Sequence, residues 1–351
     1  MLVEWSKPDF GPQELNAATN SLHNFIGGNG PEVLLLEQEF AQKVGSKYAI
    51  ATCNGTAALL VALLALKDKY NCSKVGVPSY TFVASANSSY NIFGESVKLL
   101  DVDIKNWNLS VEHIPSDIDL LMTVDVGGLS CDYDTISELE IPIVADSAES
   151  LGSTYKGQHV GTQADMHCFS LHRSKIVSCG EGGMITTDSE DLYDKARSLV
   201  NHGYDKDKKP YEYKHSNFGL NFRMCDVNAA IARTQLKKLS HYVRHRNTVA
   251  EIYKNEITLP VQKFGSDFVS NYFFFGVIVE DRYDFIQKLD NKGVKAKSWS
   301  AVHTQPVWSN KHNENLKNSQ FLSDHVVLLP IYNTISIEEV QYVCKVIKDI
   351  V

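Results

Sequence analysis

The sequence contains no long hydrophobic run. No segment approaches the roughly 20 apolar residues that a membrane-spanning helix needs. The first residues, Met1 to Lys7, do not have the architecture of a signal peptide. We therefore expect a protein with no membrane segment that works in the cytoplasm.

Basic residues are also in short supply. Lysine and arginine together number 34, against 42 aspartates and glutamates, so the formal net charge is −8. Proteins that bind nucleic acid need a basic face to neutralise phosphates, and this charge argues against that class. A local basic site for the diphosphate of a small molecule is still compatible with it.

Cysteine is sparse and shows no pairing pattern. The seven cysteines form an odd set without close spacing, unlike the framework of a disulfide-rich domain. We interpret them as free thiols in a reducing compartment, in agreement with the cytoplasm. We expect no bound metal.

The apolar residues that are present form short runs, which alternate with turns or helix-like segments. The runs that we expect to be strands are 47–53, 75–77, 96–101, 118–124 and 141–145. Alternation of this kind predicts an α/β fold with a largely parallel sheet.

The last third of the chain has a different character. From about residue 257 it contains short strands and helices that indicate an α+β unit. Two separate helices are expected before it, at 226–239 and 240–255. The predicted division is a large α/β domain, residues 1–240, and a small C-terminal α+β domain, residues 241–351.

Lys175 stands in a loop between two strand-like runs. Small hydroxyl residues surround it, Ser170, Ser174 and Ser178, and a glycine-rich turn at 180–183 follows. Backbone and hydroxyl donors can approach an anion here while an amine lies within reach of an aldehyde. The setting suits a lysine that forms a Schiff base with a phosphorylated aldehyde cofactor. A plain strand–loop–strand hairpin explains the segment equally well.

Asp146 ends the apolar run that begins at Ile141. A strand that terminates in aspartate can direct one charge into a cleft at the carboxyl edge of a parallel sheet. Such a carboxylate can keep a pyridinium nitrogen protonated, or it can simply cap the following turn. Asp146 and Lys175 together, in this order, favour a site for a phosphorylated aldehyde cofactor over a plain hairpin and a turn cap.

The turn Asn54-Gly55-Thr56 separates an expected strand from an expected helix. A helix start with small residues and free N–H groups binds phosphate through its backbone amides and its dipole. Asn54 and Thr56 are also ordinary N-cap residues, so the turn alone does not decide between the two interpretations.

A set of motifs recurs in order along nearly the whole chain. They are Gly30 to Val33, Asn54 to Leu59, Pro78 to Phe82, Asp146 to Glu149, Tyr155 to Gly157, Ser170 to Gly183, Asn201 to Gly203 and Gly219 to Met224. Each is weak alone, but the ordered set is specific. It resembles the DegT/DnrJ/EryC1/StrS sugar aminotransferases.

The resemblance implies a fold-type I, pyridoxal-phosphate-dependent transferase like aspartate aminotransferase. It implies that Lys175 and Asp146 are catalytic, and that pyridoxal 5'-phosphate is the cofactor, with pyridoxamine phosphate as its aminated form. Such enzymes act on nucleotide-linked keto sugars.

The resemblance also implies further cofactor contacts. Gly55, Thr56 and Ser170 would serve the phosphate, and Phe82 would stack on the pyridine ring. Asn221 would reach the cofactor of a neighbouring subunit, which implies a homodimer. From the residues alone, a phenylalanine at a helix start is equally a core residue, and a loop asparagine is equally a helix cap.

Several other positions are less clear. Glu149 lies three residues past Asp146, where the resemblance implies a place near cofactor and sugar, and a satisfied polar residue is the alternative. Asp125 stands where the family usually has histidine. His303 falls where relatives present sugar-facing residues, so no role is assigned to it. The lysine-rich loop 204–214 is either solvated or close to a diphosphate.

The resemblance favours one reaction. An amino group would move from L-glutamate to C4 of a nucleotide-linked 4-keto-6-deoxyhexose, giving a viosamine-type product, with perosamine or a bacillosamine precursor as close competitors. A C3 keto-sugar transaminase shares every motif. A nucleotide-sugar-binding regulatory protein is the non-enzyme alternative. A sibling branch that catalyses sugar 3-dehydration replaces the lysine with histidine, which Lys175 argues against.

Overall fold

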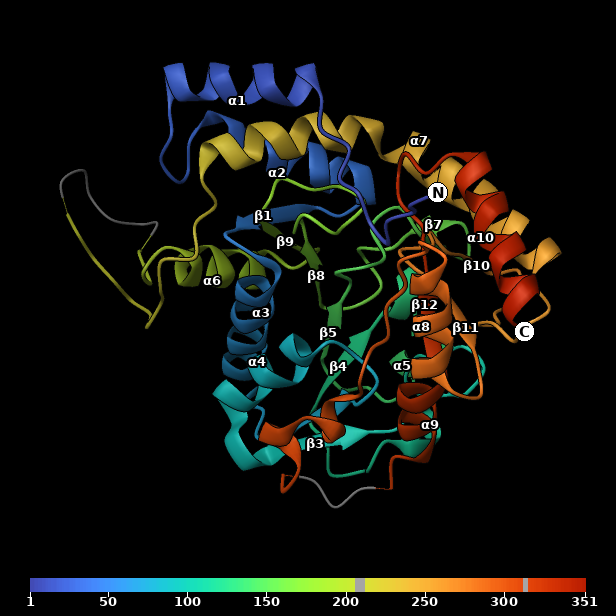
Figure 1. Cartoon of the computed structure of the whole chain (residues 1–351). Helices are drawn as coiled ribbons and strands as arrows, with labels where there is room; N and C mark the ends of the chain where they lie inside the picture. Colours follow the sequence, from blue (N-terminus) through green and yellow to red (C-terminus); the bar gives the residue numbers. More distant parts are fainter. Residues whose placement is uncertain (206–211, 312–314) are drawn as a thin grey trace.

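A computed structural model of the chain (Figure 1) describes residues 1–205, 212–311 and 315–351. The strands of its main sheet are β1 (Tyr48–Thr52), β2 (Val75–Pro78), β3 (Val97–Leu100), β4 (Leu120–Val124), β5 (Ile143–Asp146), β8 (Met166–Ser170) and β9 (Gly183–Thr187). They lie in the order β1-β9-β8-β5-β4-β2-β3. Only β9 is antiparallel to its neighbours in this sheet. The predicted α/β fold with a mostly parallel sheet is therefore confirmed.

Ten α-helices are present in the described residues. They are α1 (Pro12–Asn24), α2 (Pro31–Val44), α3 (Gly55–Tyr70), α4 (Val83–Phe93), α5 (Tyr133–Ser137), α6 (Glu190–Val200), α7 (Asp226–Glu256), α8 (Arg282–Asn291), α9 (Lys317–His325) and α10 (Ile337–Ile350). Helix α7 packs along both α1 and α2, and α3 packs on β8, β9, α4 and α6. The sheet thus has helices that cover it from segments far apart in the sequence (Figure 1).

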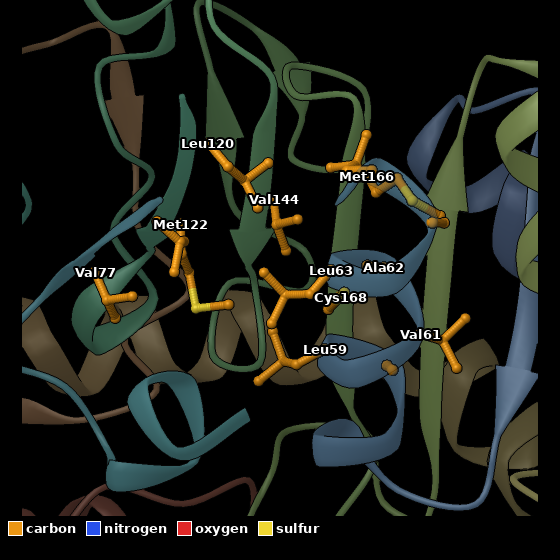
Figure 2. Packing of buried hydrophobic residues seen from close by; sticks show 14 of the residues in the cluster. Leu59, Val61, Ala62, Leu63, Val77, Leu120, Met122, Val144, Met166 and Cys168 are labelled. Carbon is orange, nitrogen blue, oxygen red and sulfur yellow. The ribbon is translucent and has the colours of Figure 1, made fainter. Parts of the chain in front are cut away.

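The main core forms where α3 packs on the sheet. The helix is apolar on nearly all sides, and side chains such as Leu59 and Leu63 lie among those of β4, β5 and β8 (Figure 2). The strands β4 and β5 are buried along their whole length, as expected for parallel strands with both faces covered. Burying one leucine side chain fully contributes about 1.5–3 kcal/mol to the free energy of unfolding. The packing of α3 on the sheet therefore stabilises the strands whose ends carry the site.

The C-terminal part has its own small core. Strands β11 (Phe275–Ile278) and β12 (Val326–Leu329) form an antiparallel pair, which packs with α8, α10 and the second half of α7. Val3 joins this core and forms a bridge with Val294. A separate three-stranded sheet of β6 (Thr154–Tyr155), β7 (Gln158–His159) and β10 (Phe268–Val269) packs Tyr155 and Phe268 against residues of the main sheet.

Helix α7 corrects one expectation. The two helices predicted at 226–239 and 240–255 are one continuous helix of 31 residues, because Ser240 does not interrupt it and the buried positions Leu239, Tyr242 and Arg246 continue the same face. The predicted domain boundary between residues 240 and 241 lies inside this helix, and the division into two domains stays a prediction.

Arg246 of α7 is buried, and no carboxylate pairs with it among the described residues. Its guanidinium donates to Asn333 Oδ1 at 2.9 Å and to the carbonyls of Tyr272, Phe273 and Ile331 at 2.9, 3.2 and 3.2 Å. Desolvation lowers the pKa of Arg246 to about 9. These four acceptors come from two different segments, so one side chain joins α7 to both.

We expect Arg246→Met to lower the free energy of unfolding by about 2–4 kcal/mol, because methionine keeps the apolar stem but leaves buried acceptors without donors. Chemical denaturation measures this loss. Arg244→Met is the matched control, since Arg244 is exposed two residues away on the same helix. Equal stability of the two variants would contradict the role of Arg246 in joining α7 to these two segments.

Candidate active site

The start of α3 has the backbone geometry that could hold an anion. Asn54 Oδ1 accepts a hydrogen bond from Ala57 N at 2.8 Å, which leaves the amides of Gly55 and Thr56 without an acceptor within the described residues. A Cβ on Gly55 would lie 2.9 Å from Cβ of Ser170, so the helix start closely approaches the end of β8. Two free N–H groups, a helix dipole and the Ser170 hydroxyl fit a phosphate group.

Asp146 stands at the carboxyl end of β5 and is buried. Its Oδ2 accepts a hydrogen bond from Ser85 Oγ at 2.7 Å, and its Oδ1 accepts from Ala148 N at 3.2 Å. Burial raises the pKa of Asp146, while Ser85, Ala148 and Lys175 oppose that rise. A buried carboxylate with two neutral donors is suited to a cationic ring nitrogen.

Phe82 is the N-cap residue of α4, and its ring is 65% exposed. Ser85, which holds Asp146, is one turn further along the same helix. The exposed face of Phe82 could stack on a flat ring, while the same helix carries Ser85, which hydrogen-bonds to Asp146. These features suit pyridoxal phosphate.

Lys175 lies in the loop between β8 and β9. Its Nζ donates to Glu149 Oε1 at 3.4 Å and lies 4.2 Å from the centre of the Phe273 ring. Backbone hydrogen bonds from Leu171 N to Gly182 O at 2.8 Å and from Lys175 N to His172 O at 2.8 Å fix the loop. The lysine is thus a held amine and not a free surface charge.

Glu149 is the partner of Lys175. Its Oε2 accepts a hydrogen bond from Gly127 N at 2.9 Å. Burial raises the pKa of Glu149 to about 7, with Lys175 acting in the opposite direction. Its contact with the amine of Lys175 is compatible with either interpretation of this residue, and a role beside cofactor and sugar stays a prediction.

The structure brings most of the predicted residues together. Half-buried Lys175 hydrogen-bonds to the buried Glu149 and lies near enough to the buried Asp146 to oppose the rise in the pKa of both carboxylates. Asn221 does not join them. It is exposed, it forms a backbone bridge with Asn201, and its side chain makes no hydrogen bond within the described part of the chain.

Three residues of the site were not predicted. Ser85 lies one turn after Phe82, and a serine at that spacing facing a strand-end aspartate was a usable signal. Phe273 lies in an aromatic run, and Gly127 acts through its backbone N–H; neither position has a local signal, because both contacts depend on long-range packing.

The less certain positions are also placed. His303 Nδ1 lies 2.7 Å from Ser79 Oγ, and its Nε2 lies 2.9 Å from Gln320 Oε1. Residues 206–211 of the lysine-rich loop lie outside the described residues. Within the described residues, no cluster of histidine, cysteine or acidic side chains could hold a metal ion, and no helix is long and apolar enough to span a membrane.

Comparison with known proteins agrees with this geometry. The DegT/DnrJ/EryC1/StrS aminotransferase family profile matches residues 8–348. A GDP-perosamine synthase from Escherichia coli O157:H7 is 31% identical over 339 residues, which cover 93% of this chain and 92% of that protein.

Solved structures share the fold. A protein of Streptococcus pneumoniae described as a sugar aminotransferase, solved in its PMP form, has a TM-score of 0.93 at 23% identity, covering 100% of this chain and 98% of that one. Helicobacter pylori PseC, an aminotransferase of pseudoaminic acid biosynthesis, has a TM-score of 0.89 at 20% identity over 99% of both chains.

The family match spans nearly the whole chain, and it confirms the predicted fold type, the enzyme class and pyridoxal phosphate as the cofactor. The residues around Lys175 fit that cofactor independently of the match. On both grounds, the chain belongs to the DegT/DnrJ/EryC1/StrS aminotransferase family.

Proposed function

We propose that this enzyme transfers an amino group from L-glutamate to C4 of a nucleotide-linked 4-keto-6-deoxyhexose, for the synthesis of a glycan or polysaccharide. The observation that carries this proposal is the contact of Lys175 Nζ with Glu149 and Phe273, in the cluster that also contains Asp146. A held amine beside an ionisable carboxylate can bind an aldehyde and exchange protons at one atom.

Each of these residues has a distinct role. When bound, pyridoxal phosphate supplies an electron sink for the bond that breaks at the amino donor. Asp146 keeps the ring nitrogen protonated, and Phe82 holds the ring flat. The amides of Gly55 and Thr56, with Ser170, bind the phosphate.

Proton transfer is assigned to Lys175. Its neutral amine takes up a proton at Nζ and releases it again, and Glu149 Oε1 accepts the hydrogen bond from that amine at 3.4 Å. The ring of Phe273 lies over the same amine, which excludes water from that side. The arrangement supports a general acid–base role for Lys175.

The acceptor is proposed from the relatives. The 31% identical E. coli relative is named a GDP-perosamine synthase, which supports amination at C4 and makes a perosamine-type product a competitor equal to the viosamine-type product favoured by the sequence. A C3 transaminase is the alternative, and a nucleotide-sugar-binding regulatory protein is the non-enzyme alternative.

We also propose a homodimer in which Asn221 serves the neighbouring active site. Large apolar side chains are exposed on α1, on the loop that follows it, on α2 and on the segment before α7, namely Leu15, Leu22, Ile26, Leu34, Phe218 and Leu220. The bridge between Gly28 and Cys225 brings these segments together. Exposed apolar surface next to Asn221, whose side chain makes no hydrogen bond within the described residues, supports a subunit interface there.

The cofactor's absorbance band tests the reaction. We expect glutamate to bleach the band of the loaded protein and one nucleotide-linked 4-keto-6-deoxyhexose to restore it. Lys175→Ala is expected to lose both half-reactions, because the amine is removed. Lys263→Ala, at an exposed position, is the control. Restoration only by a 3-keto sugar would move the enzyme to the C3 class, and a protein that never acquires the band would favour the binding-protein alternative.

Mixed dimers test the role of Asn221. Lys175→Ala and Asn221→Asp are each expected to be inactive, the second because a carboxylate would repel the cofactor phosphate. Refolding them together should restore about a quarter of wild-type activity, since half of the dimers would hold one intact site. A mixture no more active than its parents would place Asn221 in its own subunit's site.

Glu149→Gln tests the carboxylate. The rate at which the cofactor-free protein takes up pyridoxal phosphate should rise as pH increases through about 7, where Glu149 ionises and can accept the proton from Lys175. Glutamine cannot accept a proton, so the rise should disappear. Because the folded pKa of Glu149 is above the ordinary 4.5, its own contribution to wild-type stability should fall as pH rises from 4.5 to about 7, a fall that Glu149→Gln should lack. An unchanged pH profile in the variant would exclude this role.

A further inference from the structure

Asp125 directly follows β4 and is fully buried. Its Oδ1 accepts hydrogen bonds from Cys131 N at 2.9 Å and Tyr133 Oη at 3.0 Å. Its Oδ2 accepts from Ser147 Oγ at 2.8 Å and Ser150 Oγ at 2.7 Å. Burial raises the pKa of Asp125, whereas these four donors favour the ionised form. The carboxylate is thus saturated with neutral donors.

The hydrogen bonds of this cluster have a fixed direction. His167 Nε2 accepts from the amides of Gln163 and Ala164, each at 3.0 Å, so this nitrogen carries no proton. His167 Nδ1 therefore carries the proton and donates to Ser147 Oγ at 2.9 Å. Ser147 must then donate its own proton to Asp125. Burial lowers the pKa of His167 to about 3, which keeps the ring neutral.

The cluster encloses the backbone of Glu149. Ser147 and Ser150, both bound to Asp125, flank Glu149 on either side. The other oxygen of the Glu149 carboxylate is held by Gly127, two residues past Asp125. Asp125 N also donates to Asp146 O at 3.1 Å. Asp125 therefore holds the turn 147–150, which contains Glu149, and lies in the same turn as Gly127, which binds the Glu149 carboxylate.

We infer that Asp125 is a positioning residue of the reaction, which holds Glu149 against Lys175 through Ser147 and Ser150. This inference rests on the role proposed above for Lys175 and Glu149. The four donors require a carboxylate at this position, since an imidazole offers a single acceptor and could not receive all of them.

Asparagine cannot replace Asp125 without a loss, although its shape is the same. The amide oxygen would have to face Cys131 N, because a backbone N–H cannot accept. The amide NH2 would then face Ser147 and Ser150. Ser147 already receives the proton of His167, so its own hydroxyl proton would lose its acceptor. The lost hydrogen bonds would be those of Ser147 and Ser150, the two serines that flank Glu149.

The test is Asp125→Asn in the full chain, freed of cofactor and then mixed with pyridoxal phosphate. We expect the uptake rate at about pH 8 to fall roughly tenfold and the rise of the rate through pH 7 to disappear, as for Glu149→Gln. The double variant should be no slower than Glu149→Gln alone, because both changes remove one function. Thermal unfolding of each variant shows whether the fold is kept.

Other groups face Glu149 and are held constant in this comparison. Lys175 and Asp146 affect its charge, and the buried Tyr80 responds to it. Facing Asp125 itself are Tyr133 and the thiol of Cys131. None of these residues is altered by the substitutions, so a change in the pH profile would report on the position of Glu149.

If Asp125→Asn does not fold, Ser150→Ala can test the same inference, since it removes only one of the four hydrogen-bond donors to Asp125. Its matched control is Ser130→Ala, because Ser130 is a buried serine of a neighbouring turn that donates to Cys131 O at 2.8 Å and does not contact Asp125. We expect Ser150→Ala to weaken the rise through pH 7 and Ser130→Ala to retain it.

The outcomes separate this inference from the proposed function. If wild-type protein takes up no cofactor, the proposed function fails and the inference with it. If wild-type uptake depends on Glu149 but Asp125→Asn and Ser150→Ala retain the pH-dependent rise, the inference alone is overturned. Independent, multiplying effects of Asp125→Asn and Glu149→Gln would overturn it as well.

Discussion

Burial of negative charge at one edge of the sheet is the constraint on which the site depends. Asp125, Asp146 and Glu149 all lie buried where β4 and β5 end. Isolated carboxylates are costly in such surroundings, so each must be compensated by hydrogen bonds or by a cation. Asp125 is compensated by four neutral donors. Asp146 and Glu149 have fewer donors, and Lys175 is the cation that acts on both.

This unequal compensation separates structural from chemical roles. A carboxylate that is saturated with donors has no capacity left for a ligand, and Asp125 is in that state. Asp146 receives two hydrogen bonds and keeps an affinity for a further positive charge, such as the protonated ring nitrogen of the proposed site. Glu149 contacts the amine of Lys175, and burial raises the pKa of Glu149 to about 7, which suits the proton exchange proposed for that amine.

The sequence predicts those parts of the site that depend on local patterns. A strand ending in Asp146, a helix beginning at Gly55 and the glycine-rich loop around Lys175 each have a signature within a few residues. Contacts between distant segments have no such signature, as Phe273 over Lys175 illustrates. The same holds for Asp125, whose function depends on three segments that converge only in the fold. The break expected near residue 240 was wrong because serine is a weak helix breaker and a buried face continues through it.

Contacts made by Arg246 connect the C-terminal core to both sides of the loop that contains Lys175. The guanidinium of Arg246 holds the Phe273 carbonyl, and the ring of Phe273 lies over Lys175. Arg246 also holds Asn333, whose amide donates to Ile176 O at 2.8 Å, one residue past the lysine. Two short paths therefore run from α7 to either side of Lys175. A shift of the C-terminal core would move the ring and the loop together, so the amine keeps its surroundings only while that core stays packed against α7.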